Sequence, residues 1–350
     1  MDTEEAEIVG TEELKPGMRA ATDIENRYGG VLVPAGEVLT GSKIDKLKQL
    51  NYKLVYIISE EDHDSNLDGL GIKEKAYRSD VRRAASLYKR LKYEEEIDYD
   101  EFRLLTKNTM EMSSTLELDE LLNMVQDADE YTYTHLINVG ILCSMMAKWL
   151  DLSQKRTEKL TQAGLLHDVG KAKISEEILN KPDTLSEEEF DEVKKHSLYG
   201  YKMIDRSKFI SDEVARGVLT HHEKYGGGGY PLGISGKDIP LFGRILALAD
   251  GFDAITSARI YRRKRSPFEA LKIFRRENFT HYDPELREIF MEKVPNYFMK
   301  EKVRLNDGSE GKIVFINYRE PEHPMVKIED NGYVDLSEKP ELKIEEIIRN

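Results

Sequence analysis

The stretch HLINVGILCSMMAKWLDL, residues 135–152, decides the fold class of this chain. Its apolar residues recur at steps of three and four positions, which is the spacing of one face of an α-helix. RRAASLYKRLKYEEE (82–96) and LDELLNMVQDA (118–128) repeat that spacing, and few alternations of β-branched residues interrupt it. We therefore predict a mainly α protein, with helices from about residue 81 to residue 300.

Both flanks of the helical region show strand signals instead. The N-terminal signals lie in LKPGMRAATDI (14–24), VLVPAGEVLT (31–40) and KLVYII (53–58), with a helical spacing in SKIDKLKQLN (42–51). On the C-terminal side, KVRLNDGSEGKIVFINY (302–318) and MVKIEDNGYVDLS (325–337) each hold a DG or NG dipeptide between alternating segments. Because such dipeptides are typical of hairpin turns, each flank is predicted to be a small β-rich module.

The length of 350 residues is comfortable for two or three domains. Between the N-terminal module and the helices, SEEDHDSNLDG (59–69) is polar and acidic, as linkers often are. We predict a β-rich accessory module at 1–60, a linker and helical connection at 61–117, a helical catalytic domain at 118–300 and a β-rich C-terminal module at 301–350.

Acidic residues outnumber basic residues in this chain. The 66 Asp and Glu against 52 Lys and Arg give a net charge of −14 at pH 7. A field of that sign repels polyanions, so binding to DNA or RNA polymers is disfavoured, although a small anionic ligand could bind where local basic residues outweigh it. Hydrophobic residues make up 39% of the chain, which excludes a wholly disordered protein.

The cysteine content and the apolar segments indicate the cellular compartment of the protein. Cys143 is the only cysteine, which excludes an intramolecular disulfide and a cysteine-based zinc site. The N-terminal MDTEEAEIVG is acidic and lacks the apolar core of a signal peptide. No apolar run approaches the roughly 18 residues of a membrane span. These features predict a cytoplasmic protein that does not enter a membrane.

Histidines and aspartates recur along the helical region. They are His135, His167, Asp168, His196, His221, His222 and Asp250. Imidazole and carboxylate together suit first-row metals such as Fe, Mn, Zn or Ni. Neighbours in a helix, such as His167 and Asp168, point about 100° apart, so one could bind a metal while the other reaches a second metal. His221 and His222 have the same relation and could serve different faces of one cluster.

A simpler interpretation exists for any one of these histidines, because a lone His in a helix is usually a surface or satisfied core residue. We expect that role for His63 and His323, which lie in polar surroundings, whereas His281 lies near the end of the helical region. The whole set is harder to explain in this way. Imidazoles and carboxylates buried within apolar helical runs are costly unless they are paired or bound to metal.

The order of these motifs resembles HD-GYP domains, a subset of the HD phosphohydrolase superfamily. The residues that carry the resemblance are His135, HDVGK (167–171), His196 with Gly200, HHEKYGGGGYP (221–231), RILALADGFDAITSARIYRRKRSP (244–267) and HYDPEL (281–286). The similarity spans roughly residues 120–295, and the GYP tripeptide directly after the double histidine is its most specific sign. It implies a bundle of helices around metal ions. It also implies hydrolysis of cyclic di-GMP to linear pGpG, with GMP as a further product left open.

The resemblance also implies the site. The metal ligands carried over by position are His135, His167, Asp168, His196, His221, His222 and Asp250. They would hold two divalent metal ions, with Fe or Mn favoured, bridged by Asp168 and by a hydroxide that attacks the phosphate. Some relatives add a third metal through a Glu four residues before the first histidine. Tyr131 occupies that position here and Glu130 is displaced around the helix, which favours two metals.

Basic and aromatic residues near these motifs are the expected catalytic and substrate-binding groups. Lys171 would stabilise charge on the phosphate or protonate the leaving 3′-oxygen, the alternative being a solvated lysine. In the basic run 259–265, Arg259 and Arg262 match the family's substrate-binding positions, whereas Arg263, Lys264 and Arg265 are expected at the surface. Tyr230 would line the guanine or sugar pocket. Asp129 matches a family position that assists Lys171 or the metal ligands, though a solvated turn explains it almost as well.

Two departures from the family pattern keep other functions open. Gly226 stands where the family usually has Asp, and Ala258-Arg259-Ile260 replaces a typical Asp-Arg-Pro. Neither removes a metal ligand, but both could loosen the substrate site. The alternatives are therefore a weakly active or inactive cyclic di-GMP receptor and another HD-family nucleotide phosphohydrolase. For the N-terminal module we favour packing against the catalytic domain over formation of a homodimer or sensing.

Overall fold

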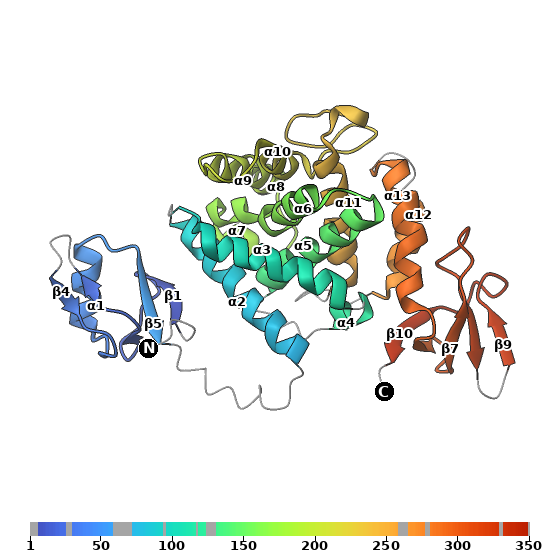
Figure 1. The fold of residues 1–350 in the computed structure, drawn as a ribbon, viewed down its shortest axis with the longest axis horizontal. Coiled ribbons are helices and arrows are strands. Elements are labelled where there is room, and N and C mark those ends of the chain that lie inside the picture. Colours follow the sequence, from blue (N-terminus) through green and yellow to red (C-terminus); the bar gives the residue numbers. More distant parts are fainter. Residues whose placement is uncertain are drawn as a thin grey trace. The chain divides into compact units, whose positions relative to one another are not determined.

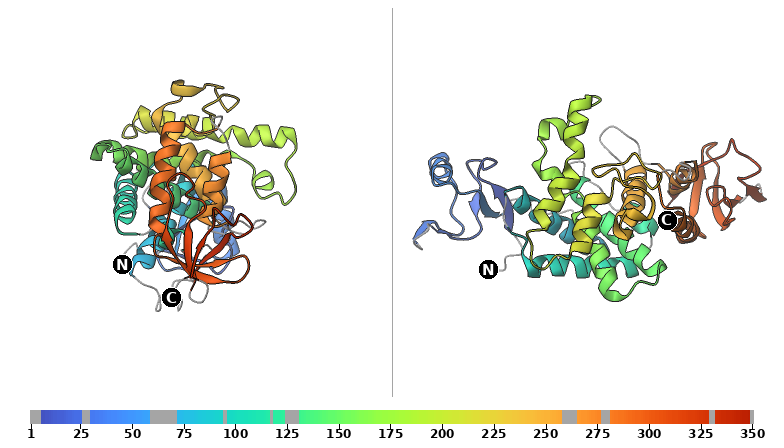
Figure 2. Two further views of the ribbon diagram at one scale, coloured as in Figure 1. Left: turned by 90° about the vertical axis from the view of Figure 1, so that its right-hand side faces the viewer. Right: turned by 90° about the horizontal axis from the view of Figure 1, so that it is seen from above.

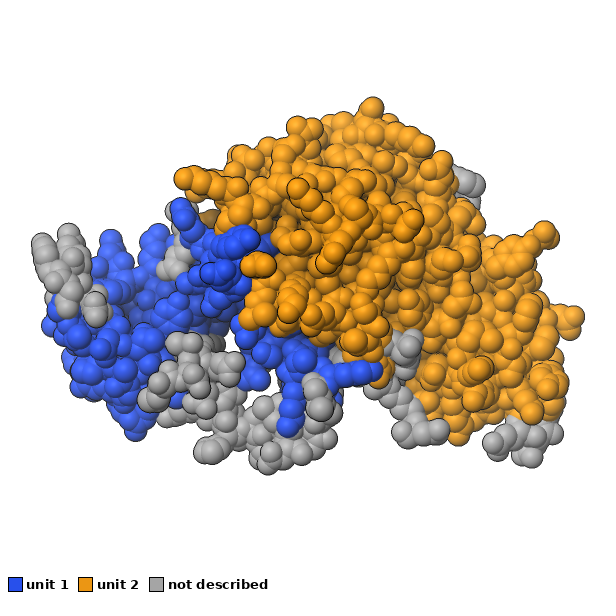
Figure 3. Space-filling model, in the orientation of Figure 1, with its two compact units in different colours: residues 1–102 blue, residues 103–350 orange. Residues whose placement is uncertain are grey.

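The computed structural model describes residues 6–25, 30–58, 72–93, 96–116, 118–123, 131–257, 265–276, 281–328 and 332–348. The chain divides into two compact units, Met1–Phe102 and Arg103–Asn350 (Figure 3). Helices dominate the second unit and small sheets lie near both ends of the chain (Figure 1). The predicted fold class is confirmed. The division into four parts stays a prediction.

The first unit begins with a small sheet and ends with a long helix. Its elements are β1 (Ala6–Gly10), β2 (Arg19–Ala20), β3 (Ile24–Glu25), β4 (Val31–Val33), α1 (Gly41–Gln49), β5 (Leu54–Ile58) and α2 (Ile72–Lys92). The antiparallel sheet has the order β1-β5-β2, and β3 pairs with β4. Its core holds buried Val9, Leu39, Leu47, Val55 and Ile57. Alternation along β5 and the helical spacing of α1 therefore bury their apolar residues together.

Helix α2 begins earlier than the predicted start of the helical region. Its buried residues Tyr77, Val81, Ala84, Leu87 and Leu91 follow one another at steps of three and four. The stripe thus extends ahead of residue 81. Because charged residues lie between the apolar positions, the part of this helix before residue 81 resembles a linker in the sequence.

The second unit is built mainly of helices, joined by short turns. Its helices are α4 (Leu118–Asn123), α5 (Tyr131–Trp149), α6 (Gln154–Leu166), α7 (Glu176–Leu179), α8 (Glu187–Lys194), α9 (His196–Ile204), α10 (Asp212–Thr220), α11 (Leu241–Thr256), α12 (Pro267–Arg276) and α13 (Pro284–Lys293). The 3₁₀ turns are η3 (Val169–Lys173), η4 (Gly236–Asp238) and η5 (Val294–Phe298). Helix α3 (Tyr99–Thr115) begins before the boundary of the two units and continues into the second.

Helices α5 and α11 form the centre of this unit (Figures 1 and 2). All residues from Thr134 to Ala147 in α5 are buried, and this stretch contains no Asp, Glu, Lys or Arg. A helix that is apolar on all sides belongs in a protein core. Helix α6 packs closely on α5, since a Cβ at Gly164 would lie 2.7 Å from the Cα of Gly140. These buried helices carry several of the histidines and aspartates.

The C-terminal module is a five-stranded antiparallel sheet in the order β10-β6-β7-β8-β9. Its strands are β6 (Lys302–Leu305), β7 (Glu310–Phe315), β8 (Met325–Ile328), β9 (Gly332–Asp335) and β10 (Ile344–Ile348). The predicted DG turn joins β6 to β7, with Gly308 at φ 86°. Arg275 of α12 binds Glu322 at 2.6 Å, which ties the module to the helical part of the unit. No helix among the described residues is long and apolar enough to cross a membrane.

Candidate metal centre

The seven predicted ligands converge from segments that are far apart in the chain. His135 lies in α5 and Asp250 in α11, while His196 begins α9. His221 and His222 directly follow α10. His167 ends α6 and Asp168 follows it in the turn before η3. The fold thus places the ligands at helix ends and on the two central helices.

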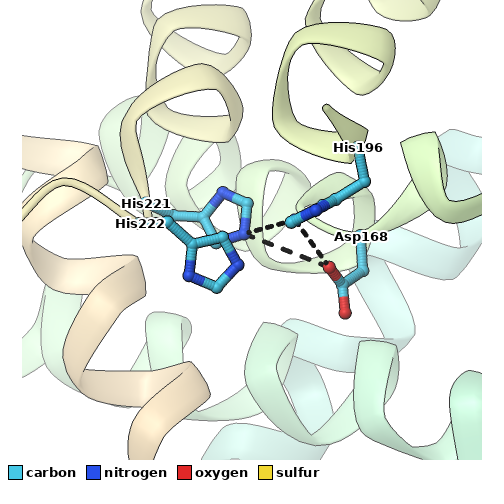
Figure 4. A group of neighbouring side chains, drawn as sticks. All are labelled: Asp168, His196, His221 and His222. Carbon is cyan, nitrogen blue, oxygen red and sulfur yellow. Dashed lines mark hydrogen bonds and ion pairs between the residues drawn. The ribbon is translucent and has the colours of Figure 1, made fainter. Parts of the chain in front are cut away.

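The ligand atoms form two neighbouring groups. One holds Asp168, His196, His221 and His222, and the other holds His135, His167 and Asp250. Within each group the atoms that could bind a metal lie within 4.8 Å of one another. Figure 4 shows the first group, with His196 and Asp168 facing the histidine pair. The two adjacent histidines therefore belong to the same group.

The carboxylate of Asp168 lies between the two groups. Its Oδ1 atom is 3.3 Å from Nε2 of His196 and 4.0 Å from Nε2 of His221. Its Oδ2 atom is 3.4 Å from Nε2 of His167 and 3.7 Å from Nε2 of His135. One side chain, itself 2% exposed, thus offers one oxygen to each group. This arrangement agrees with the bridging role that the resemblance implied.

Hydrogen bonds fix which nitrogen of several imidazoles carries the proton. The Nδ1 atom of His167 lies 2.8 Å from the carbonyl oxygen of Gly164, three residues earlier in the chain. The Nδ1 atoms of His196 and His221 likewise lie 2.7 Å and 2.6 Å from the carbonyl oxygens three residues before them. A carbonyl can only accept, so each Nδ1 must donate and each neutral ring presents its Nε2 lone pair to the centre. Metal-ligating histidines have this arrangement.

Two of these lone pairs meet without a hydrogen between them. The Nε2 atoms of His196 and His221 lie 3.4 Å apart, and Nε2 of His167 lies 3.2 Å from Nε2 of His135. The buried Oδ1 of Asp168 has no hydrogen-bond partner among the described residues. Facing acceptors in a buried site repel one another unless a cation lies between them. The donor set therefore fits divalent metal ions, and its mixture of imidazole and carboxylate suits first-row metals.

The protonation of the groups reflects burial and their neighbours. Burial would lower the pKa of His135, but hydrogen bonds and charge from Asp250 and Asp253 outweigh it and raise the pKa from 6.5 to about 9. Burial lowers the pKa of His222 to about 3. It also lowers the pKa of His196, and lowers that of His221 well below the ordinary value. Without a metal, His196, His221 and His222 are thus neutral while His135 holds a proton.

The two aspartates are held ionised. Burial would raise the pKa of Asp168, but the charges of Lys171 and the nearby histidines hold that pKa well below its usual range. For Asp250, burial also opposes ionisation, and the hydrogen bond and charge of His135 lower the pKa. Both carboxylates are therefore available as anionic ligands.

Lys171 contacts Asp168, not His167. A helix that continued past His167 would place Lys171 one turn beyond that histidine and on the same face. The helix ends at that histidine, however, and the tighter 3₁₀ turn η3, with three residues per turn, places Lys171 above Asp168. Its Nζ atom donates to Asp168 Oδ2. A side chain at Gly170 would collide with the carbonyl oxygen of His196, so glycine allows η3 to pack against α9.

The glycine loop after the histidine pair lies against the centre. The ring of Tyr230 stacks on that of His222, with centroids 4.8 Å apart and an interplanar angle of 27°. Oε1 of the buried Glu223 accepts hydrogen bonds from the backbone N–H groups of Leu232 at 2.6 Å and Gly233 at 3.0 Å. Tyr230 is thereby brought beside His222, a predicted metal ligand, and its place in the substrate pocket stays a prediction.

Other predicted residues lie elsewhere or outside the described residues. Arg259, Arg262, Arg263, Lys264, Ala258, Ile260, Asp129, Glu130 and His63 all lie outside them. His281 and His323 belong to neither ligand group as described. The backbone carbonyl of His281 accepts from the N–H of Tyr225, so this residue helps to anchor the glycine loop.

Three buried residues around the centre were not predicted from the sequence. They are Asn138, Glu223 and Asp253. In the sequence, Asp253 lies three residues after Asp250 and so on an adjacent part of the helix, but its contact to His135 has no signal in that spacing. Glu223 follows the histidine pair directly, but its contact to residues nine and ten positions later has no signal in the spacing.

The model of the HD domain family matches residues 98–286, which is more than half of the chain. This chain belongs to the HD domain family. The predicted resemblance is confirmed. A cyclic di-GMP phosphodiesterase of Pseudomonas aeruginosa is 36% identical over 210 residues, covering 59% of this chain and 50% of that protein.

Further relatives are similar over about half of this chain. A cyclic di-GMP phosphodiesterase of Thermotoga maritima is 35% identical over 191 residues, covering 53% of this chain and 52% of that protein. A 3′3′-cGAMP-specific phosphodiesterase of Vibrio cholerae is 35% identical over 173 residues, covering 49% of this chain and 33% of that protein. The chain thus spans about half or less of the length of these relatives.

A solved structure shares the fold. It is Bd1817, an HDG"Y"P protein from Bdellovibrio bacteriovorus, which aligns with a TM-score of 0.53 and 18% identity. The alignment covers 81% of this chain and 97% of that protein. The likeness extends well beyond the matched HD domain and supports the arrangement of the helices.

Proposed function

We propose that this chain is a metal-dependent phosphodiesterase that hydrolyses cyclic di-GMP to linear pGpG. The observation that carries the proposal is the position of Asp168, whose two carboxylate oxygens face two separate groups of histidines. A carboxylate with this placement suits a pair of metal ions about 3.5–4 Å apart, as two-metal phosphoryl-transfer sites use.

Two metal ions, with iron or manganese favoured, would be held by His135, His167 and Asp250 on one side and His196, His221 and His222 on the other, with Asp168 shared. When bound, such ions supply a hydroxide nucleophile at neutral pH and positive charge for the phosphoryl oxygens. The protein's own contribution is to present neutral Nε2 atoms and ionised carboxylates in a buried, fixed arrangement.

Lys171 and Tyr230 border the centre and are proposed to contact the substrate. The Lys171 side chain is 31% exposed and contacts Asp168, so its ammonium group could approach a phosphate while keeping its contact to that carboxylate. It would stabilise negative charge or protonate the leaving 3′-oxygen. Tyr230, stacked on His222, presents an aromatic surface next to the ligands for a guanine or a sugar. Arg259 and Arg262 are proposed to bind phosphate by paired hydrogen bonds.

The choice of cyclic dinucleotide rests on the relatives. Two of them are named as cyclic di-GMP phosphodiesterases and one as specific for 3′3′-cGAMP. Both substrates contain two 3′–5′ phosphodiester bonds in a ring, and both would place a phosphate at the same metal pair. We propose cyclic di-GMP as the first substrate and 3′3′-cGAMP as the second candidate.

Product analysis on the metal-loaded protein tests the proposal. The chain is purified without oxygen, its metal content is measured, and cyclic di-GMP, 3′3′-cGAMP and dGTP are incubated with it before chromatography. We expect pGpG from cyclic di-GMP and no attack on dGTP. Binding of cyclic di-GMP without turnover would instead identify a receptor, and hydrolysis of dGTP alone would identify another nucleotide phosphohydrolase.

A further inference from the structure

His135 differs from three other histidines of the centre in the partner of its Nδ1 atom. His167, His196 and His221 each use a backbone carbonyl three residues earlier in the chain. Nδ1 of His135 instead lies 2.6 Å from Oδ2 of Asp253. A carboxylate is a stronger acceptor than a carbonyl because the hydrogen bond is assisted by its charge.

Asp253 is fully buried in α11 and its contacts are divided between its two oxygens. Oδ2 faces His135, while Oδ1 accepts hydrogen bonds from Asn138 Nδ2 at 2.8 Å and Ser257 Oγ at 3.0 Å. Asn138 and His135 both lie on α5, so Asp253 connects the two central helices. Two donors hold one oxygen and thereby orient the other oxygen toward the imidazole.

We propose that Asp253 is a positioning residue of the metal centre, which keeps the proton of His135 on Nδ1 and its Nε2 lone pair directed at the metal. This inference rests on the proposed metal-dependent function. Nε2 of His135 lies 3.1 Å from Asp250 Oδ1 and 3.2 Å from His167 Nε2, so a rotated ring or a proton on Nε2 would disturb the whole group. Acceptors behind ligating histidines fix both the tautomer and the ring orientation.

The geometry distinguishes this role from simple packing, because Asp253→Asn is nearly isosteric. Asn138 and Ser257 both donate to one oxygen, so they retain the amide oxygen of an asparagine on their side. The amide NH₂ group then faces Nδ1 of His135 and donates to it. The proton moves to Nε2, and the lone pair that should bind metal is lost. Asp253→Ala leaves a cavity but imposes no tautomer.

Cobalt binding to the full chain tests the inference. The metal-free protein is titrated with Co²⁺ alone, followed by its visible absorption and by calorimetry, for the wild type, Asp253→Asn, Asp253→Ala and Ser257→Ala. We expect two Co²⁺ per wild-type chain. In Asp253→Asn the affinity of one site should fall roughly 10- to 100-fold, with a changed absorption band, while the other site keeps its affinity. Ser257→Ala removes a bond to Oδ1 but leaves Asn138 as a donor to that oxygen, and it should bind both ions nearly as the wild type does.

Thermal melting of the metal-free variants completes the test. If Asp253 is a positioning residue, the melting temperature of Asp253→Asn should be closer to that of the wild type than the melting temperature of Asp253→Ala is. Asp253→Asn should nevertheless bind Co²⁺ no more tightly than Asp253→Ala does. If Asp253→Asn binds both ions with wild-type affinity, or loses affinity equally at both sites, the inference is overturned. A wild type that binds no Co²⁺ would refute the proposed metal-dependent function itself, which is a distinct result.

Discussion

Asp168 is the residue at which the two ligand groups meet, and its replacement should therefore affect both. We expect Asp168→Ala to retain close to no metal, compared with two ions per wild-type chain, because each group loses a carboxylate oxygen. His196→Ala should lose about one ion, since His196 belongs to a single group. Metal per folded chain, measured by elemental analysis, checks both expectations.

A matched aspartate serves as the control for this prediction. Asp191 has a side chain that is 68% exposed and pairs with Lys194 outside the centre. Asp191→Ala should keep both ions. Full metal content in Asp168→Ala would show that the carboxylate is not shared between two metals.

The protonation of the histidines predicts how acid releases the metals. The pKa of His135 is raised to about 9 in the metal-free protein, so a metal must displace a proton there at any pH below that value. The pKa of His222 is lowered to about 3 and those of His196 and His221 are also lowered, so these rings offer free lone pairs. As pH falls from 8 to 5.5, the site of His135 should lose affinity roughly tenfold per pH unit, and the other site much less.

Dialysis against a metal buffer at each pH, followed by metal analysis, measures this difference. As the pH is lowered, the metal content should stay at a plateau near one ion per chain over the range between release of the first metal and release of the second. His196→Ala, which removes a ligand of the acid-resistant site, should abolish that plateau. Release of both ions together in the wild type would contradict the assignment of the proton to His135.

The seven predicted ligands could be selected from the sequence because each is a histidine or aspartate within or beside an apolar helical stretch. All seven lie in the two groups of the structure. It could not predict how they divide between the groups, because that depends on how α5, α6, α9, α10 and α11 pack. Asp253 was missed for the same reason, since its role comes from a contact to a residue 118 positions earlier.

At the scale of elements, the glycine loop between α10 and η4 depends on Glu223. Its carboxylate accepts from the backbone of Leu232 and Gly233 and so holds the segment that carries Tyr230 against His222. We expect Glu223→Ala to lower the free energy of unfolding by about 3 kcal/mol, since hydrogen bonds to a buried charged group are lost. It should also raise KM for the substrate several-fold. Denaturant unfolding and steady-state kinetics measure the two effects.

Glu223→Gln is the matched variant. Its amide oxygen can still accept from both backbone N–H groups, so its KM should remain near that of the wild type. Limited proteolysis between residues 224 and 235 should be faster in Glu223→Ala only. Equal cleavage and equal KM in the two variants would show that Glu223 does not hold the loop.

Several elements were predicted in kind but not in detail. The pattern of α5 indicated a helix, and the structure buries it on all sides because its stretch 134–147 is free of charged residues. The HD dipeptide was expected within a helix, yet the helix ends at His167 and Asp168 begins a turn. Tight packing against α9 at Gly170 explains this turn, and such a contact between distant segments has no signature in local periodicity.

At the scale of the whole molecule, the two compact units differ in their dependence on metal. The unit Met1–Phe102 has its own apolar core, whereas all seven ligands lie in the unit Arg103–Asn350. Ligand binding stabilises the cooperatively folding unit that contains the site. Chelation of the metals should therefore lower the melting temperature of the second unit and leave the first unit nearly unchanged.

The expected size of this effect follows from mass action. Metal at about a hundred times its Kd stabilises the folded state by about 2.7 kcal/mol. For a unit of this size that corresponds to a shift of roughly 5–10 °C for each metal, and therefore of about 10–20 °C for the two metals together. Calorimetric scans with and without EDTA measure the shift. Hydrogen exchange shows which unit it belongs to. On chelation, amides of the second unit should lose protection, while those of β1, β5 and α1 should keep theirs. Asp168→Ala provides the control, since a chain that has already lost its metals should show no shift with EDTA. An equal loss of protection in both units would contradict this expectation. It would mean that the two units unfold together as one cooperative body, although each has its own core.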